Sequence, residues 1–262
     1  MKIGLAQTSA VTDVAANLDV IIEYAIKAKQ QGCEVICFPE CFLTGYAPEE
    51  TKTLSVSKEC KQLKKISEIA VEKEIDILIG FMEVEEDKYY ITHGVLKMNG
   101  EREYYRKTHL GEKESIYFSE GDVLNILELS NGVKIGFQLC VETHFFEITK
   151  ALSLRGAEIV FAPHAVPRKA GCRKSIWMKI IPARSYDNRV YMACCNQWDE
   201  KNYGGGCMVT DPKGDVIAQF FENEEGLLVA EIDVEEIKRY HEANAGKKYR
   251  YYPSKERKEL YE

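Results

Sequence analysis

The chain has 262 residues, of which 45% are hydrophobic and 29% are charged, and its formal net charge at pH 7 is −7. This composition is typical of a globular protein with a sizeable core, and it disfavours general binding to nucleic acids or anionic membranes, which needs clustered positive charge. No apolar run reaches the roughly 18 residues of a membrane span, and no signal peptide is apparent, so we expect a cytoplasmic protein with a small-molecule partner.

The first half of the chain predicts alternating strands and helices. Residues 2–8 and 34–38 resemble strands, and the segment between them has apolar residues at helical spacing up to Gly32. A second cycle begins at Ser57, which we expect to cap a helix that leads to the strand at 75–84. Asn99-Gly100 then separates two strand-like segments, which indicates an antiparallel hairpin.

The second half continues with a hairpin at Asn131-Gly132 and further strands and helices. The expected helices lie at 148–156, 175–189 and 234–244, and the expected strands at 158–165, 190–197, 206–210, 216–221 and 227–233. No linker or fixed repeat divides the chain, so residues 1–262 form one expected domain. The mixture of segments predicts an α/β fold, a four-layer α-β-β-α sandwich of two mixed sheets with helices on the outer faces.

Nine cysteines are spread through these expected elements without the dense spacing of a disulfide scaffold, so most should be reduced. We find no CxxC pair and no HxxxH motif, and therefore expect no metal and no cofactor. Cys194 and Cys195 are adjacent in an expected strand and would point to opposite faces. That geometry disfavours a redox function for the pair.

Three reactive side chains follow three expected strands. Glu40 follows EVICFP, Lys107 follows EREYYR, and Cys140 follows VKIGFQL. Loops at strand ends can project side chains into a common crevice, which is where α/β folds place catalytic groups. Taken singly, each residue has a simpler explanation as a solvated carboxylate, a surface lysine or a buried thiol.

Together, however, the motifs around these residues resemble the nitrilase, or carbon-nitrogen hydrolase, superfamily along the whole chain. The matching stretches are KIGLAQT, CFPECFLTGY, YYRKTHL, YFSEGD, GFQLCVETHFFE, PARSYDNRVYMACCNQ and VTDPKGDVIA. Their order and spacing are far more specific than any one of them. The resemblance implies a hydrolase that cleaves a non-peptide C–N bond of a small linear amide or N-carbamoyl compound through a thioester acyl-enzyme.

The resemblance also implies a Glu-Lys-Cys site formed by Glu40, Lys107 and Cys140. Glu40 would accept the thiol proton, and Lys107 and the backbone N–H of Val141 would stabilise the negative charge that develops on the substrate oxygen. The family has a second glutamate some seven residues after the lysine, which corresponds here to Glu114. Glu112 is the alternative if the loop register differs by two residues.

The chain departs from the family pattern after Cys140. Many members that act on carbamoyl or carboxylate-bearing substrates have an acidic residue and an arginine at the second and fourth positions, where this chain has Glu142 and His144. Neutral histidine lacks the bidentate fork of arginine, so a carboxylate anchor at that position is in doubt. His144 and His164 are candidate substrate-binding residues, and the basic side chains of residues 168–174 could hold an acidic substrate or be solvated.

Several alternatives remain open at this point. Nitrile hydrolysis, a non-catalytic binding module and acyl transfer to an amine all fit the same fold. The family commonly forms dimers, so we also expect a homodimer or higher homo-oligomer. Residues 241–262 would form a C-terminal tail that packs on a partner subunit, since its aromatic residues suit an interface.

Overall fold

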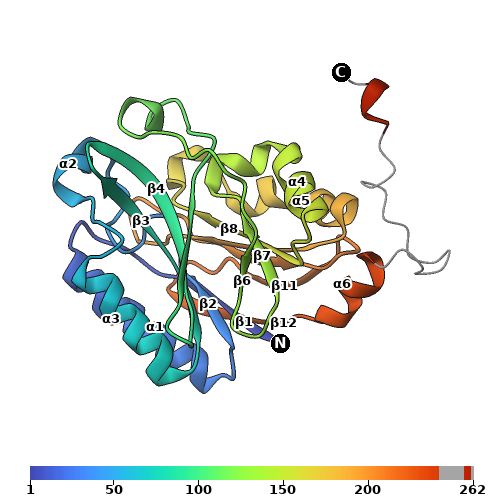
Figure 1. The fold of residues 1–262 in the computed structure, drawn as a ribbon, viewed down its shortest axis with the longest axis horizontal. Coiled ribbons are helices and arrows are strands. Elements are labelled where there is room, and N and C mark those ends of the chain that lie inside the picture. Colours follow the sequence, from blue (N-terminus) through green and yellow to red (C-terminus); the bar gives the residue numbers. More distant parts are fainter. Residues whose placement is uncertain (242–256, 261–262) are drawn as a thin grey trace.

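Two β-sheets lie face to face between helices in a computed structural model that describes residues 1–241 and 257–260 (Figure 1). The strands are β1 (Lys2–Gln7), β2 (Val35–Cys37), β3 (Asp76–Glu85), β4 (Lys88–Leu96), β5 (Arg102–Arg106), β6 (Leu127–Glu128), β7 (Lys134–Phe137), β8 (Ile159–His164), β9 (Tyr191–Asn196), β10 (Cys207–Thr210), β11 (Val216–Phe220) and β12 (Gly226–Glu231). In the described part of the chain, the first sheet has the order β12-β1-β2-β3-β4-β5 and the second has the order β11-β10-β9-β8-β7-β6.

The helices cover the outer faces of these sheets. The α-helices are α1 (Val14–Gln30), α2 (Thr51–Leu54), α3 (Lys61–Lys73), α4 (Phe146–Leu154), α5 (Arg173–Asn188) and α6 (Val234–His241). Short 3-10 turns are η1 (Pro48–Glu50), η2 (Glu114–Ile116), η3 (Cys140–His144), η4 (Arg168–Ala170) and η6 (Lys258–Leu260). In Figure 1, α1 and α3 lie on the side of the first sheet, and α4 and α5 lie beyond the second.

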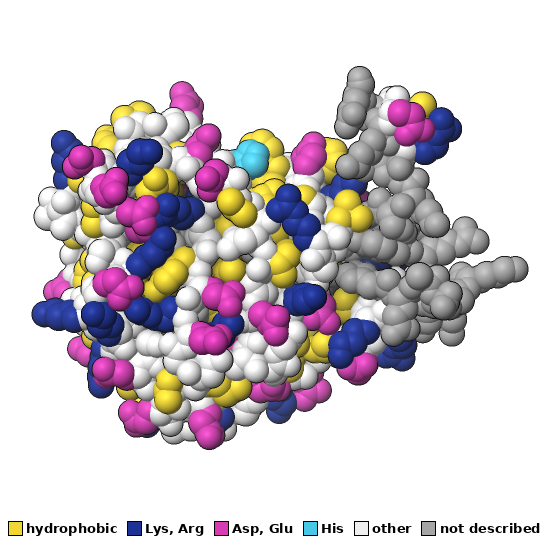
Figure 2. Space-filling view, in the orientation of Figure 1, with side chains coloured by type: hydrophobic (Ala, Val, Ile, Leu, Met, Phe, Trp, Pro, Cys, Tyr) yellow, Lys and Arg dark blue, Asp and Glu magenta, His cyan; other side chains and the backbone are white. Residues whose placement is uncertain are grey.

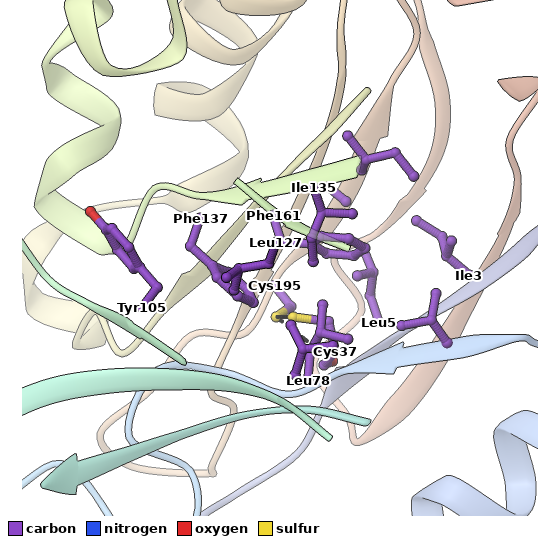
Figure 3. Packing of buried hydrophobic residues seen from close by; sticks show 14 of the residues in the cluster. Ile3, Leu5, Cys37, Leu78, Tyr105, Leu127, Ile135, Phe137, Phe161 and Cys195 are labelled. Atoms are coloured by element: carbon purple, nitrogen blue, oxygen red, sulfur yellow. Dashed lines mark hydrogen bonds between the residues drawn. The ribbon is translucent and has the colours of Figure 1, made fainter. Parts of the chain in front are cut away.

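Three hydrophobic clusters explain the layers. The largest lies between the sheets and includes Leu5, Cys37, Phe137 and Cys195 (Figure 3). A second cluster joins the first sheet to α1 and α3, and a third joins the second sheet to α4 and α5. Because successive side chains of a strand point to opposite faces, each sheet has two apolar faces to bury. The four-layer α-β-β-α sandwich predicted from the sequence is therefore confirmed.

Strand direction determines where the functional residues can meet. In the first sheet β1, β2 and β3 are parallel, and in the second β7, β8 and β9 are parallel. The backbone N–H of Glu40, just after β2, donates to the carbonyl of His164 at the end of β8 over 3.3 Å. The carboxyl ends of these strands in the two sheets therefore lie against each other, as a site shared between the sheets requires.

Both asparagine-glycine hairpins are confirmed, whereas some boundaries differ from the prediction. β4 pairs with β5 and β6 pairs with β7, both antiparallel. The cap predicted at Ser57 is wrong, because α3 begins at Lys61 and the Cys60 thiol accepts from the Leu63 N–H over 3.5 Å. A spacing pattern does not reveal which of several small polar side chains will cap a helix.

The residue pair Cys194 and Cys195 has the predicted orientation. Cys195 belongs to the cluster between the sheets, and Cys194 belongs to the cluster under α4 and α5. The predicted tail at residues 241–262 falls mostly on residues 242–256 and 261–262, which lie outside the described residues. Within residues 1–241 and 257–260, no helix has the length and apolar character needed to cross a bilayer.

Candidate active site

The three residues singled out at strand ends come from both sheets. Glu40 follows β2 and Lys107 follows β5 in the first sheet, while Cys140 follows β7 in the second. The Lys107 ammonium donates to Glu40 Oε1 over 2.8 Å and to Glu114 Oε1 over 2.8 Å. Glu40, Lys107 and Glu114 are all buried. A buried lysine held between two carboxylates is a strongly coupled charge cluster and not a surface ion pair.

The second glutamate of this cluster is Glu114, and Glu112 is exposed. Glu114 begins the short turn η2, where its Oε2 accepts from the backbone N–H of Gly111 over 2.6 Å. Its Oε1 also accepts from the Tyr46 hydroxyl over 2.9 Å. These bonds fix the carboxylate against the lysine and resolve the register question in favour of residue 114.

Cys140 lies at the start of η3 with a φ of 49°, in the left-handed region that non-glycine residues rarely adopt. It is a half-buried free thiol, whereas Cys37, Cys41 and Cys195 are buried. The thiol is electrostatically coupled to the carboxyl group of Glu40 and to the backbone of Ala165. Cys140 is thus a partly exposed residue with a carboxylate neighbour.

Burial and neighbouring charges shift the pKa values of the cluster. Burial and the nearby Glu114 raise the pKa of Glu40 to about 7, against the lowering effect of Lys107. Burial acts to lower the pKa of Lys107, but the attraction of the surrounding acidic groups outweighs it and raises that pKa. Burial raises the pKa of the Cys140 thiol, and the Glu40 carboxylate raises it further. The resting site therefore holds a protonated thiol beside a carboxylate that can accept a proton near neutral pH.

The backbone of Lys107 is held from two sides. Its N–H donates to Ile91 O over 2.8 Å, and its carbonyl accepts from the Gly121 N–H over 2.8 Å. A side chain at position 121 would collide with the backbone carbonyl of Arg106, so glycine is required for this close approach. The YFSEGD stretch, noticed in the sequence only as a motif, thus has a physical role in positioning the lysine.

Glu142 was considered in the sequence only as a feature of substrate preference, but it connects two site loops. Its carboxylate is buried, and Oε2 accepts from the Leu139 N–H over 2.7 Å. Four donors bond to Oε1: the Tyr105 hydroxyl, the Thr108 N–H and hydroxyl, and the His109 N–H. Figure 3 shows the Tyr105 hydroxyl directed away from the apolar cluster. Glu142 therefore ties the loop after Lys107 to the turn that carries Cys140.

The remaining predicted residues surround the same turn. Val141 and His144 belong to η3, where Val141 is half-buried and His144 is exposed. His164 is buried, its Nδ1 lies 2.7 Å from Ala162 O, and its ring packs on Trp177 with centroids 4.9 Å apart. Burial lowers the pKa of His164 to about 3. Substrate contacts by these three residues stay predictions, and the backbone of His164 has a structural role through its bond to Glu40.

A cavity of about 400 Å³ borders the cluster. It is lined in part by Tyr46, which bonds to Glu114, and by Ala165, whose backbone interacts with the Cys140 thiol. In the described part of the chain, no group of His, Cys, Asp and Glu side chains could hold a metal ion. The residues that line the cavity thus include direct neighbours of Glu114 and Cys140.

Known proteins match this chain along most of its length. Residues 2–242 match the family described as carbon-nitrogen hydrolase. The glutamine-dependent NAD(+) synthetase of Thermotoga maritima is 31% identical over 249 residues, which cover 90% of this chain but only 42% of the synthetase. The (R)-stereoselective amidase of Pseudomonas sp is 27% identical over 244 residues, which cover 91% of this chain and 87% of the amidase.

A solved amidase structure shares the whole fold. A mutant of the amidase from Nesterenkonia sp. AN1 has a TM-score of 0.85 against this chain, with 25% sequence identity over 100% of this chain and 95% of that one. That structure shows covalent addition of the acetamide moiety of fluoroacetamide at its active-site cysteine. The fold, the family match and these relatives together show that the chain belongs to the carbon-nitrogen hydrolase family, within the nitrilase superfamily.

Proposed function

We propose that this protein hydrolyses the C–N bond of a small linear amide or N-carbamoyl compound, with Cys140 as nucleophile. The observation that carries the proposal is the pair of 2.8 Å bonds from Lys107 Nζ to Glu40 and Glu114, beside a half-buried thiol. A chain that served only as a binding module would gain nothing from a buried ammonium between two carboxylates, because such clusters are costly to bury.

Acylation begins when Cys140 Sγ attacks the amide carbon and the thiol proton passes to Glu40. A new S–C bond forms, and the carbonyl oxygen becomes an oxyanion. Lys107 and the backbone N–H of Val141 stabilise this oxyanion. The proton on Glu40 then passes to the leaving nitrogen, the C–N bond breaks, and ammonia or an amine departs to leave a thioester on Cys140.

Deacylation repeats these transfers with water. Glu40 takes a proton from water while the oxygen of water attacks the thioester carbon. The C–S bond then breaks, the acid is released, and the proton on Glu40 returns to the Cys140 sulfur. Glu114 positions Lys107 during both halves, since it accepts a second hydrogen bond from the same ammonium. An amine that competes with water at this stage would give acyl transfer.

The test is ammonia release from a panel of amides, ureido acids and nitriles by the native protein and by Cys140→Ser. We expect release from amides by the native chain only, and the mass of the native chain should increase transiently by that of the acyl group. Cys194→Ser serves as the matched control, because this thiol lies under the helices and away from the cavity. Equal turnover by native protein and Cys140→Ser would refute the proposal.

Nitrile hydrolysis is the weaker candidate. Glu142, two residues after the proposed nucleophile, already accepts hydrogen bonds from protein donors through both of its oxygens. It therefore has no free position for substrate chemistry. The nitriles in the same panel test this ranking. A nitrile that is hydrolysed faster than the corresponding amide would make nitrile hydrolysis the favoured function.

We also propose that the protein forms a homodimer. Several apolar side chains on and beside α4 and α5 are exposed, namely Phe145, Phe146, Leu154, Met178 and Tyr186. An exposed patch of this kind marks an interaction surface. Light scattering on the purified full chain should give twice the mass of 29.9 kDa, and Phe146→Ser should shift the distribution towards monomer. A monomeric native chain at micromolar concentration would exclude the dimer.

A further inference from the structure

The cavity that borders the cluster has a charged rim and an uncharged interior. The lining residues that are exposed are polar or charged, namely Glu49, Lys113, Arg168, Lys169, Lys201 and Asn202. Acidic and basic side chains are also interspersed on the face of the molecule in Figure 2. The lining residues that are buried or half-buried are uncharged, namely Tyr46, Pro48, Ala165, Pro167 and Tyr203. Because apolar surfaces favour apolar ligands, the interior of the cavity suits a hydrocarbon chain better than a charged group.

One side of this cavity is formed by the loop at residues 198–205, between β9 and β10. The loop starts beside the cluster, because Gln197 Nε2 donates to the backbone carbonyl of Glu40 over 3.1 Å. It then folds back on itself. The Asp199 N–H donates to the Tyr203 carbonyl over 3.2 Å, and Asp199 Oδ1 accepts from the Tyr203 N–H over 3.0 Å. Both backbone groups of Tyr203 are thus bonded within the loop, and its side chain is the part that it can present to the cavity.

Arg168 holds this loop from the end of the neighbouring strand β8. Its backbone N–H donates to the Asn202 carbonyl over 2.6 Å. Its Nη2 donates to the carbonyls of Asp199 and Tyr203 over 2.7 and 2.9 Å. Its Nη1 donates to Asn223 Oδ1 over 3.2 Å. Although Arg168 is exposed, its guanidinium is therefore used to bind several protein acceptors at once, which its planar fork of donors permits.

The base of the loop is closed as well. The Gly205 N–H donates to the Gln197 carbonyl over 2.9 Å, and Asn196 Nδ2 donates to the Gly205 carbonyl over 3.1 Å. Burial raises the pKa of the Tyr203 hydroxyl to about 12, and the negative charge of Glu40 contributes, as expected for a side chain near the cluster. A loop that is bonded at its base and along its length has little freedom to move away from a ligand.

We propose that Tyr203 is a specificity-determining residue, which limits the size of the acyl group, and that Arg168 is the positioning residue that holds Tyr203 in place. The preferred substrate is then an amide with a short, apolar acyl chain. A larger acyl group would collide with the ring instead of displacing it, since the loop is fixed. The inference rests on the proposed amidase function and specifies its substrate class.

Acetamide, butyramide and 4-phenylbutyramide test the two parts of this inference. Butyramide has two more methylenes than acetamide, so its kcat/KM should be higher by about 10-fold, the effect of burying two methylenes. 4-Phenylbutyramide adds one phenyl ring to butyramide, and its kcat/KM should be lower than that of butyramide by about 10-fold or more. A native chain that hydrolyses acetamide as well as butyramide would overturn the apolar interior.

Variants at Tyr203 separate the effect of its ring from that of its hydroxyl. Tyr203→Ala removes a ring similar in size to the phenyl group of the larger substrate. It should raise the ratio of 4-phenylbutyramide to butyramide kcat/KM by about 10-fold or more. Tyr203→Phe is the matched control, because it keeps the ring and should leave the ratio unchanged. The same ratio in Tyr203→Ala as in the native chain would overturn the size limit.

Variants at Arg168 test the positioning role, and they do so even if Tyr203→Ala fails to fold. Arg168→Gln should shift the ratio in the same direction by about 3-fold or more, the equivalent of a lost hydrogen bond, and mainly through KM. Arg168→Lys keeps the charge without the fork, so it should behave like Arg168→Gln. Lys169→Gln is the control, because it removes the same charge from the same rim. A native ratio in Arg168→Gln, or an equal shift in Lys169→Gln, would exclude the positioning role.

Calorimetric titration of Cys140→Ala with butyramide and with 4-phenylbutyramide separates this inference from the proposed function. Tighter binding of 4-phenylbutyramide after addition of Tyr203→Ala supports the size limit even if the native chain hydrolyses no amide, in which case the proposed function alone fails. An unchanged binding preference, with hydrolysis of both amides by the native chain, overturns the size limit and leaves the amidase function intact. The absence of binding of either amide also overturns the size limit.

Discussion

Two buried glutamates pair with successive basic residues at the end of β5, yet their environments differ. Glu83 accepts from Arg106 Nε over 3.0 Å and from the Thr92 hydroxyl over 2.5 Å. Lys58 adds an ion pair over 3.0 Å. Glu40 instead accepts one bond from Lys107, while its Oε2 is buried without a regular hydrogen-bond partner in the described part of the chain.

The pKa values follow this difference. Burial acts to raise the pKa of Glu83, but its three side-chain donors outweigh burial and lower that pKa. Burial dominates at Glu40, whose pKa is raised to about 7. A saturated carboxylate is a stable structural acceptor, whereas an unsaturated one can exchange a proton with a neighbouring thiol. The comparison indicates that incomplete hydrogen bonding distinguishes Glu40, the proposed base, from the structural Glu83.

The largest expected effect is on turnover in Glu40→Gln. An amide cannot accept the thiol proton, so kcat should fall by about 10²–10⁴-fold, the usual contribution of a positioned base. The free energy of unfolding should change less than in Glu83→Gln, because burial already disfavours the Glu40 carboxylate and raises its pKa to about 7, and the amide oxygen of Gln can still accept from Lys107. Amide turnover and urea unfolding of the same preparation test this. Retention of native turnover would remove Glu40 from the mechanism.

Glu83→Gln should lower the stability of the protein and leave its turnover almost unchanged. The substitution removes a charge that three donors stabilise, so we expect a loss of about 2 kcal/mol in the free energy of unfolding, reduced from the fully buried case because Arg106 is partly exposed. kcat for the folded fraction should change by less than about 3-fold, a small effect on the barrier. A large loss of kcat with native stability would show that the two carboxylates do not divide their roles in this way.

The pH dependence of kcat/KM should separate the role of Glu40 from that of Glu114. Because Glu40 must be deprotonated to act as a base, kcat/KM for butyramide should fall as the pH drops below about 7. The negative charge of Glu114 contributes to raising the Glu40 pKa. Glu114→Gln should therefore move the acidic limb to lower pH, along with a lower maximum rate. Butyramide is neutral and does not change its charge with pH. An acidic limb that stays at the same pH in Glu114→Gln would therefore mean that a group other than Glu40 controls it.

The smallest expected effect is that of Tyr46→Phe. The change removes the hydroxyl that donates to Glu114 Oε1, a bond worth roughly 1–2 kcal/mol to a charged group, and leaves the ring in place. We expect kcat/KM to fall by about 5- to 30-fold, the equivalent of that energy. The control is Tyr89→Phe, which removes a hydroxyl near the start of β4 instead of from the cluster. Equal losses of steady-state activity in both variants would indicate a general effect of hydroxyl removal.

Much of the fold followed from local patterns in the sequence. The hairpins at Asn99-Gly100 and Asn131-Gly132 depend on residues that tolerate positive φ, and both glycines adopt it, at 87° and 83°. The helix cap at Cys60 was missed, because the side chain that caps is selected by the path of the chain before the helix. Glu142 was missed as a connector, because its donors Thr108 and His109 lie 34 and 33 residues away in sequence.

The sequence by itself determined the family, the two-sheet sandwich and the candidates Glu40, Lys107, Cys140 and Glu114, because periodicity and motif order are properties of neighbouring residues. Only the tertiary structure decided that Glu114 and not Glu112 reaches the lysine, and that Glu142 joins two loops. Hydrogen bonding, burial and charge balance depend on which distant segments meet in space, and no local pattern encodes those meetings.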